Sequence, residues 1–185
     1  MLALLKSDID ALAKGSEAPD FSLLNVDGST VSLKNFKGKA VVIIFMCNHC
    51  PYVKPKMDEI AEIQDDYADK EIAMICINSN DPDYDSEDSF DNMKSVASQK
   101  GYKYYLFDEK QNVAHTYGAV CTPDPYIFNK EHRLVFHGRI NNAMSPEDRA
   151  DKHDMREVLD KLVAGEEITD WFEPSMGCSI KWRLE

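Results

Sequence analysis

The sequence predicts an α/β fold: a three-layer sandwich with a mixed central sheet and helices on both faces. Two apolar runs rich in β-branched residues, at 40–46 and 72–78, have the composition of strands buried on both faces. Helical patterns alternate with strand patterns along the chain, and this order implies a sheet covered by helices. With 185 residues and no long linker, the chain is expected to form a single domain, residues 1–185.

The first half of the chain begins with a helical pattern and a hairpin. Leucine and isoleucine residues recur at helical spacing in residues 1–14, which predicts a short amphipathic N-terminal helix. The turn Asp27-Gly28 lies between two short strand patterns, so a hairpin is expected there. The elements expected after the N-terminal helix are strands at 20–26, 30–33, 40–46 and 72–78, a helix at 52–69 kinked by Pro55, and an acidic, solvated loop at 80–88.

The second half of the chain carries clear helix start and stop signals. Gly101 is the expected stop of one helix, and Ser145 followed by Pro146 is the expected start of another. The elements expected here are helices at 89–100, 113–117 and 146–164, strands at 102–107, 126–129 and 133–138, and a tail at 166–185 packed on or near the domain.

Charge and hydropathy exclude several classes of partner. The chain has 33 acidic and 21 basic residues, with a net charge of −12, whereas nucleic-acid binding needs a basic face. Its longest apolar run is much shorter than the roughly 20 residues of a membrane span. The N-terminus lacks the basic start and apolar core of a signal peptide. We therefore expect no nucleic-acid or membrane partner and a cytoplasmic location, or a periplasmic or exported one if a signal peptide was removed.

The cysteines favour redox chemistry over a structural disulfide framework. The chain has five, at positions 47, 50, 76, 121 and 178, and only one pair is closely spaced. An odd number in a chain of this size fits a secreted disulfide scaffold poorly. A redox or metal-binding pair in a reducing compartment fits it well.

Cys47-Asn48-His49-Cys50 is the expected reactive centre, because a Cys-x-x-Cys motif here follows a buried strand and precedes a helix. At the helix N-terminus Cys47 would be exposed, and the helix dipole and free N–H groups would favour its thiolate. Cysteines in such motifs have pKa values lowered from ~8.5 to roughly 3.5–7.5. Cys50, one turn further on, would be more buried. We therefore expect Cys47 to be the nucleophile and Cys50 the resolving cysteine.

His49 directly precedes Cys50 and would lie near both sulfurs. A protonated imidazole in this place would stabilise the reduced, anionic form and make the disulfide more oxidising. The alternative is a histidine that faces solvent and has no effect on the pair.

Together these features resemble the thioredoxin-like superfamily. They are the buried strand, the Cys-x-x-Cys motif, a proline (Pro55) five residues after it and Thr122-Pro123 before a later strand. The similarity is greatest to the redoxin branch, near the alkyl hydroperoxide reductase/thiol-specific antioxidant (AhpC/TSA) proteins and the TlpA/ResA-type proteins. It covers about residues 15–165, and residues 15–21 look like the entry strand of that branch.

The resemblance implies a site around the cysteine pair. Pro123 would be the cis-proline of the family, stacked against the cysteines, and the backbone of Thr122 would bind a substrate chain as an added strand. Val41 stands where thioredoxin buries an acid that helps to deprotonate the resolving cysteine. The proton acceptor for Cys50 therefore stays open between Asp124, His49 and water.

The other cysteines have two interpretations each. Cys121, next to Thr122, is either a third redox cysteine or a packed small hydrophobe. Cys178, in the tail, is either an additional resolving thiol or a structural one. Cys76 is expected in the core. No histidine makes metal-ligand spacing with another, and the cysteine motif alone lacks a fourth ligand, so no metal or other cofactor is expected.

Three functions remain after these observations. The leading one is a thiol–disulfide oxidoreductase that acts on a protein or small-molecule disulfide or thiol, with a thioredoxin-type protein as a candidate reductant. The first alternative is a peroxiredoxin-like thiol peroxidase. Peroxiredoxins, however, carry a threonine at the position of Cys47 and an arginine near the position of Pro123. The second alternative is a copper-binding or redox-gated module without catalysis.

Overall fold

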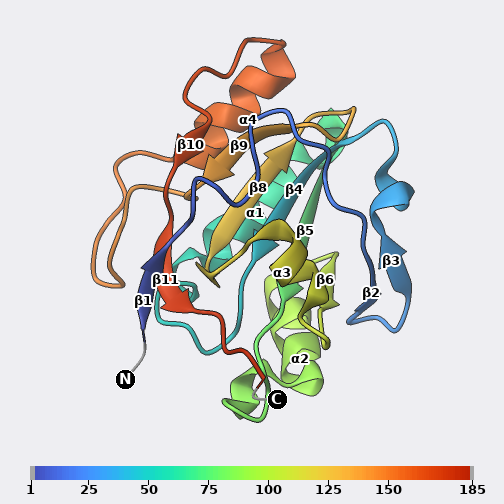
Figure 1. Ribbon diagram of the computed structural model, residues 1–185, viewed down its shortest axis with the longest axis vertical. Helices are drawn as coiled ribbons and strands as arrows, with labels where there is room; N and C mark the ends of the chain where they lie inside the picture. Colours follow the sequence, from blue (N-terminus) through green and yellow to red (C-terminus); the bar gives the residue numbers. More distant parts are fainter. Residues whose placement is uncertain (1–2, 184–185) are drawn as a thin grey trace.

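Figure 1 shows the computed structural model of the protein, which describes residues 3–183. Within these residues the main sheet has eight strands. Their spatial order is β10 (Phe172–Glu173), β9 (Leu134–Gly138), β8 (Asp124–Phe128), β4 (Ala40–Phe45), β5 (Ile72–Asn78), β6 (Tyr105–Phe107), β2 (Ser22–Asn25) and β3 (Thr30–Ser32). The strands β4, β5 and β6 are parallel, and β10 is parallel to β9. The pairs β4–β8, β8–β9, β6–β2 and β2–β3 are antiparallel. The sheet is therefore mixed, as predicted.

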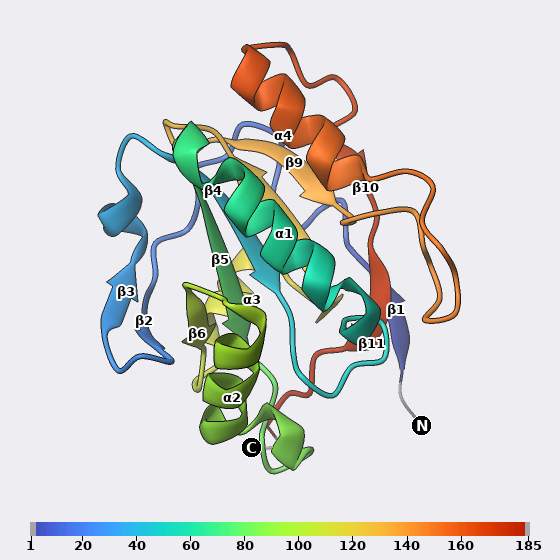
Figure 2. The same ribbon diagram turned by 180° about the vertical axis from the view of Figure 1, so that it is seen from behind.

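Helices cover both faces of this sheet. Three of them, α1 (Met57–Tyr67), α2 (Phe90–Lys100) and α4 (Asp154–Ala164), lie on one face (Figure 2), and α3 (Asn112–Tyr117) lies on the other. The central strand β4 shows why: all its residues are buried, and alternate side chains enter hydrophobic clusters on opposite faces. The three-layer α/β sandwich predicted from the sequence is confirmed.

The N-terminal helix predicted at 1–14 is wrong. Residues 3–14 form no helix, and they include the strand β1 (Leu4–Lys6); Met1 and Leu2 lie outside the described residues. This strand pairs antiparallel with β11 (Met176–Ser179), which pairs in turn with β7 (Cys121–Thr122) to make a three-stranded sheet. Of the apolar residues that suggested a helix, Leu5 and Ile9 remain exposed, and Leu12 packs partly buried against the core. Without an apolar face to bury, so short a helix is marginal, whereas pairing with β11 satisfies the backbone.

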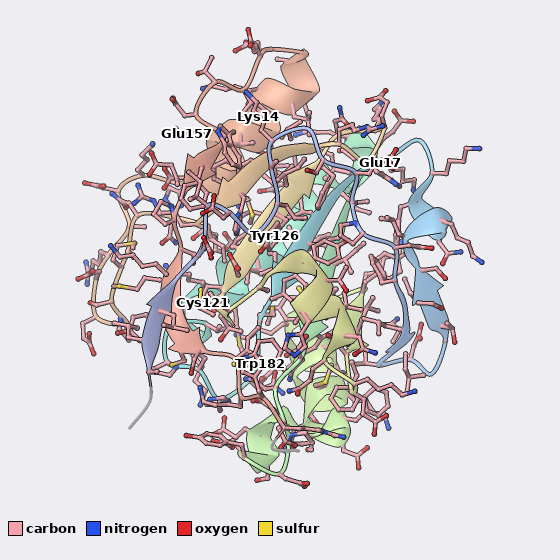
Figure 3. All side chains as sticks on the ribbon, in the orientation of Figure 1. Lys14, Glu17, Cys121, Tyr126, Glu157 and Trp182 are labelled. Atoms are coloured by element: carbon pink, nitrogen blue, oxygen red, sulfur yellow. The ribbon has the colours of Figure 1, made fainter. Side chains whose placement is uncertain are left out.

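The tail takes part in both sheets. It adds β10 beside β9 and then supplies β11, the middle strand of the small sheet. After β11, the N–H of Ile180 donates to the carbonyl of Val120 at 3.0 Å. Trp182 lies beside α3 (Figure 3), where its ring stacks on His115 with ring centroids 4.0 Å apart. The described part of the tail is thus held by specific contacts.

Two helices begin later than predicted. The helix expected at 146–164 begins at Asp154, because the carboxylate of Asp148 accepts hydrogen bonds from the N–H groups of Met144 and Ser145 and closes a turn instead. The helix expected at 52–69 is α1, which begins at Met57 after a short 3₁₀ segment, Lys54–Lys56. No helix in residues 3–183 combines the length and the apolar character that crossing a membrane requires.

Candidate redox site

Cys47 and Cys50 lie in an irregular loop between β4 and α1, and not at the start of an α-helix. Two prolines account for this. Pro51 disfavours the helical conformation of Cys50, and Pro55 occupies the first turn of the 3₁₀ segment, where its missing N–H costs nothing. The predicted exposure of Cys47 at a helix N-terminus is therefore wrong, and both cysteines are fully buried.

The two sulfurs meet the loop that contains Thr122 and Pro123. The peptide bond between these residues is cis, as the resemblance implied. The Sγ of Cys47 lies 3.4 Å from Oγ1 of Thr122, and the Sγ of Cys50 lies 3.3 Å from the carbonyl oxygen of Thr122. The fold thus brings the motif together with a residue 75 positions away from Cys47.

A hydrogen bond between the two thiols separates their pKa values. The bond with Cys47 lowers the pKa of Cys50, whereas burial raises the pKa of Cys47 well above its ordinary value. The predicted lowering therefore falls on Cys50 and not on Cys47, because this loop does not place Cys47 on a helix dipole. The pair loses its first proton easily and its second with difficulty, so its reduced form carries a single negative charge.

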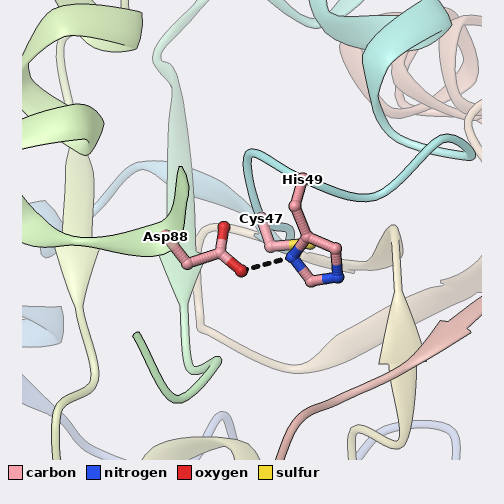
Figure 4. Close-up of side chains that lie close together, drawn as sticks. All are labelled: Cys47, His49 and Asp88. Carbon is pink, nitrogen blue, oxygen red and sulfur yellow. Dashed lines mark hydrogen bonds and ion pairs between the residues drawn. The ribbon is translucent and has the colours of Figure 1, made fainter. Parts of the chain in front are cut away.

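Asp88 is a buried partner of His49. The Nδ1 atom of His49 lies 2.5 Å from Oδ2 of Asp88 (Figure 4). The same carboxylate accepts hydrogen bonds from the backbone N–H of Asn48 at 2.6 Å and from the side chain of Asn80 at 3.0 Å. The prediction of a solvated loop at 80–88 is therefore wrong for Asp88, which is fully buried. Its hydrogen bonds compensate for that burial.

His49 is a largely buried side chain whose protonated form is favoured by Asp88, and it does not face solvent. Burial alone would lower the pKa of His49, but the hydrogen bond and charge of Asp88 raise it above its ordinary value. The carboxylate also offsets part of the histidine charge, and it raises the pKa of Cys47. Within residues 3–183, Nε2 of His49 is buried without a hydrogen-bond partner, so its proton is available to a group that enters the site.

The contacts around Asp88 favour an ion pair over a metal site. A sulfur of Cys47, a ring nitrogen of His49 and a carboxylate oxygen of Asp88 all lie within 4.8 Å of one another, so they could hold a metal ion. A structural zinc site needs four ligands, and this set supplies three donors. Both oxygens of Asp88 are already engaged by hydrogen-bond donors. For the copper-binding alternative the geometry adds Asp88 as a candidate ligand, but these three donors do not complete a four-ligand set.

The remaining candidate residues separate into those at the site and those away from it. The strand β11 places Cys178 against the site, opposite Thr122. Cys76 lies in the core of β5, where burial raises its pKa to about 12. Asp124, one candidate proton acceptor, already accepts hydrogen bonds from Ser7 at 2.7 Å and from His137 at 2.8 Å.

Replacing Asp88 by asparagine is expected to lower the pKa of His49, because burial then acts without the opposing carboxylate. In the wild-type protein the stability that His49 contributes is complete below about pH 6.5 and is lost as the pH rises through its raised folded-state pKa. The stability that Asp88 contributes is lost as the pH falls through the pKa of Asp88. Burial would raise this pKa, but the hydrogen bonds from His49 and Asn48 lower it. An NMR titration of the His49 ring measures the shift, with the exposed Asp83→Asn as control. An equal pKa in wild type and Asp88→Asn would contradict the assignment.

The fold and a cysteine pair beside a cis-proline define a thioredoxin-fold protein with a redox-type site. The chain belongs to the AhpC/TSA family, whose model matches residues 14–137. It is 25% identical over 130 residues to the thiol-disulfide oxidoreductase ResA of Bacillus thuringiensis, which covers 70% of this chain and 71% of that protein.

Solved structures share this fold. An uncharacterized conserved protein from Geobacillus kaustophilus superposes with a TM-score of 0.93 at 39% identity, covering 100% of this chain and 99% of that one. The thioredoxin domain of a thiol-disulfide oxidoreductase from Bacteroides vulgatus has the same fold, with a TM-score of 0.64 at 21% identity over 82% of this chain and 99% of that one. None of these similarities supports the expected cytoplasmic location, which stays a prediction.

Proposed function

We propose that the protein is a thiol–disulfide oxidoreductase whose Cys47–Cys50 pair cycles between a dithiol and a disulfide. The observation that carries the proposal is the contact of both sulfurs with Thr122, next to the cis-proline. The name of its ResA relative supports the same class of reaction. The single negative charge on the reduced pair supplies the thiolate that this chemistry needs.

In the proposed reaction Cys47 attacks the substrate disulfide. Both sulfurs are buried, and the lowered pKa of Cys50 makes it the base that activates Cys47. The Cys50 thiolate takes the Cys47 proton as Cys47 attacks, and it passes this proton to the first substrate sulfur that leaves. Cys50 then attacks the sulfur of Cys47, which forms the disulfide and releases the second substrate sulfur as a thiolate. Two electrons pass to the substrate, and the reverse sequence oxidises a dithiol.

His49 and Asp88 support this reaction from one side of Cys47. His49 stabilises negative charge on Cys47 and on the leaving sulfur. Its Nε2 atom has no hydrogen-bond partner within residues 3–183, so the Nε2–H group can donate a hydrogen bond to such a sulfur. Asp88 is a positioning residue, because it acts through His49. Its charge keeps His49 protonated, and its hydrogen bond fixes the ring.

The proposed substrate is a thiol or disulfide that needs no strand pairing with Thr122. The backbone of Thr122 is already paired with β11 of the same chain, so the predicted addition of a substrate strand would first have to displace β11. A thioredoxin-type protein remains a candidate reductant for the oxidised pair. No cofactor takes part in the proposed reaction.

The peroxiredoxin-like thiol peroxidase is less well supported. Within residues 3–183, the groups hydrogen-bonded to the sulfurs of Cys47 and Cys50 are Thr122, Cys178 and the two cysteines themselves. None of these is the guanidinium that polarises a peroxide in peroxiredoxins. Hydrogen peroxide consumption in the presence of dithiothreitol is the discriminating assay.

The proposal is tested by oxidising the pure protein with oxidised glutathione and counting its free thiols. The chain has five cysteines, and one disulfide should lower the count by two while catalysed exchange of a small disulfide is observed. The core variant Cys76→Ser should behave like the wild type in both respects. A thiol count that does not fall, together with exchange at the uncatalysed rate, would rule out the proposed function.

A further inference from the structure

The strand β11 brings a third cysteine to the redox pair. Its register with β7 places Cys178 directly opposite Thr122. Directly opposed residues of two antiparallel strands project to the same face of the sheet. The Thr122 side chain projects toward Cys47, with Oγ1 3.4 Å from the sulfur. The side chain of Cys178 therefore projects toward the same sulfurs, and Cys178 packs in the same buried cluster as the pair.

The backbone of β11 lies unusually close to this site. A Cβ atom on Gly177 would lie 1.9 Å from the carbonyl oxygen of Thr122, so only glycine fits at this position. The same carbonyl oxygen lies 3.3 Å from the sulfur of Cys50. One carbonyl group is therefore in contact with both Cys50 and the residue before Cys178. The two cysteines also affect each other's ionisation: the backbone and thiol of Cys178 lower the pKa of Cys50, and Cys50 raises the pKa of Cys178.

We propose that Cys178 is a third redox thiol, which attacks Cys50 in the Cys47–Cys50 disulfide and forms a Cys50–Cys178 disulfide. The step rests on the proposed function, which supplies the oxidised pair. The Cys50–Cys178 bond forms as the Cys47–Cys50 bond breaks, and the proton of the Cys178 thiol passes to the Cys47 sulfur. No net oxidation or reduction occurs. Cys47 regains its thiol and can react again, while the disulfide now joins Cys50 to Cys178 of the tail.

The electrostatics make this step conditional on oxidation of the pair. Burial raises the pKa of Cys178, and so do the negative charge of Cys50 and the hydrogen bond to it. Both effects of Cys50 disappear when Cys50 is part of a disulfide, because the disulfide is neutral. The nearby Lys181 cation acts in the opposite direction and favours the Cys178 thiolate. Cys178 is therefore least reactive beside the reduced pair and becomes more acidic beside the oxidised one.

Cys121 provides a matched control within the same small sheet. It precedes Thr122 on β7, and successive residues of a strand project to opposite faces. Cys121 is thus directed away from the pair, although it is as deeply buried as Cys50. If burial near the pair were enough for a cysteine to form a disulfide with Cys50, Cys121 and Cys178 would react alike. The proposed step predicts that Cys178 reacts and Cys121 does not.

The test maps disulfides in the full chain after oxidation with diamide, alkylation and tryptic digestion. Trypsin leaves Cys47 and Cys50 in the peptide 40–56 and Cys178 in the peptide 162–181. In Cys47→Ser, a link between these two peptides can arise only from Cys50 and Cys178. We expect this link in Cys47→Ser and in Cys47→Ser/Cys121→Ser at equal yield. In Cys47→Ser/Cys178→Ser we expect at least a tenfold loss of any link to the peptide 40–56.

Two results would overturn the proposal. One is the recovery of Cys50 and Cys178 as separately alkylated thiols in Cys47→Ser. The other is a link of Cys50 to Cys121. The wild-type digest keeps the two hypotheses apart, because a disulfide within the peptide 40–56 reports the Cys47–Cys50 pair on its own. If that disulfide forms without any link to the peptide 162–181, the third thiol is rejected and the proposed function stands. If neither that disulfide nor a link between the two peptides forms, the proposed function fails.

Discussion

Replacing Cys47 or Cys50 by serine is expected to abolish catalysed disulfide exchange, with a rate loss of roughly a thousandfold, or about 4 kcal/mol of transition-state stabilisation. The thiolate is the nucleophile of this chemistry, and a serine hydroxyl does not ionise near neutral pH. The two sulfurs act as one couple, so each single variant should lose nearly the whole effect. The measurement is the rate at which glutathione reduces a small fluorescent disulfide with and without each protein.

The pattern of trapped intermediates tests the proposed roles within the pair. Cys50→Ser should accumulate a mixed disulfide on Cys47. The variant lacks the neighbouring thiol that would attack the Cys47 sulfur and release the substrate. The matched control is Cys76→Ser, which removes a core thiol of β5 and should keep normal turnover. A mixed disulfide found only on Cys50, in Cys47→Ser, would make Cys50 the nucleophile and would strengthen the peroxidase alternative.

Most of the fold could be predicted because its core strands carry an unambiguous pattern. The six residues of β4 are apolar and all buried, and a run of this kind has few alternatives to a central strand. The end of α2 was equally clear, since Gly101 follows it as the expected stop. Residues 3–14 were mispredicted because the helical spacing of four apolar residues does not reveal whether a distant strand pairs with the same segment. Their strand depends on β11, which lies about 170 positions away in the sequence.

The site was only partly predictable. The sequence indicated Cys47, Cys50 and the Thr122-Pro123 pair, because each has a recognisable local pattern. Asp88 has no such pattern: it is one of several acidic residues in a turn-rich segment, and only the fold distinguishes it by directing its carboxylate onto His49. The helix N-terminus expected at Cys47 failed for a local reason. Pro51 and Pro55 delay the helix, so the charge on the pair depends on the hydrogen bond between its own thiols.

Replacing Gly177 by alanine is expected to uncover the cysteine pair. Gly177 has no strained backbone dihedral that demands glycine, so the effect is purely steric. The new Cβ would lie 1.9 Å from the oxygen and 2.8 Å from the carbon of the Thr122 carbonyl, which is backbone and cannot rotate away. Overpacking of this kind costs roughly 1–3 kcal/mol, and the strain is relieved if β11 separates from β7.

The rate at which an aromatic disulfide reagent labels the thiols measures this separation. Cys47 and Cys50 are fully buried, so labelling requires local opening, and about 2 kcal/mol of strain raises the open population roughly thirtyfold. Gly138→Ala is the matched control. Its Cβ would lie 2.4 Å from the carbonyl oxygen of Glu173, so it strains β9 against β10 and leaves β11 in place. Both variants should unfold at lower urea concentration, but only Gly177→Ala should label rapidly under native conditions. Equal labelling of the two variants would mean that something other than β11 covers the pair.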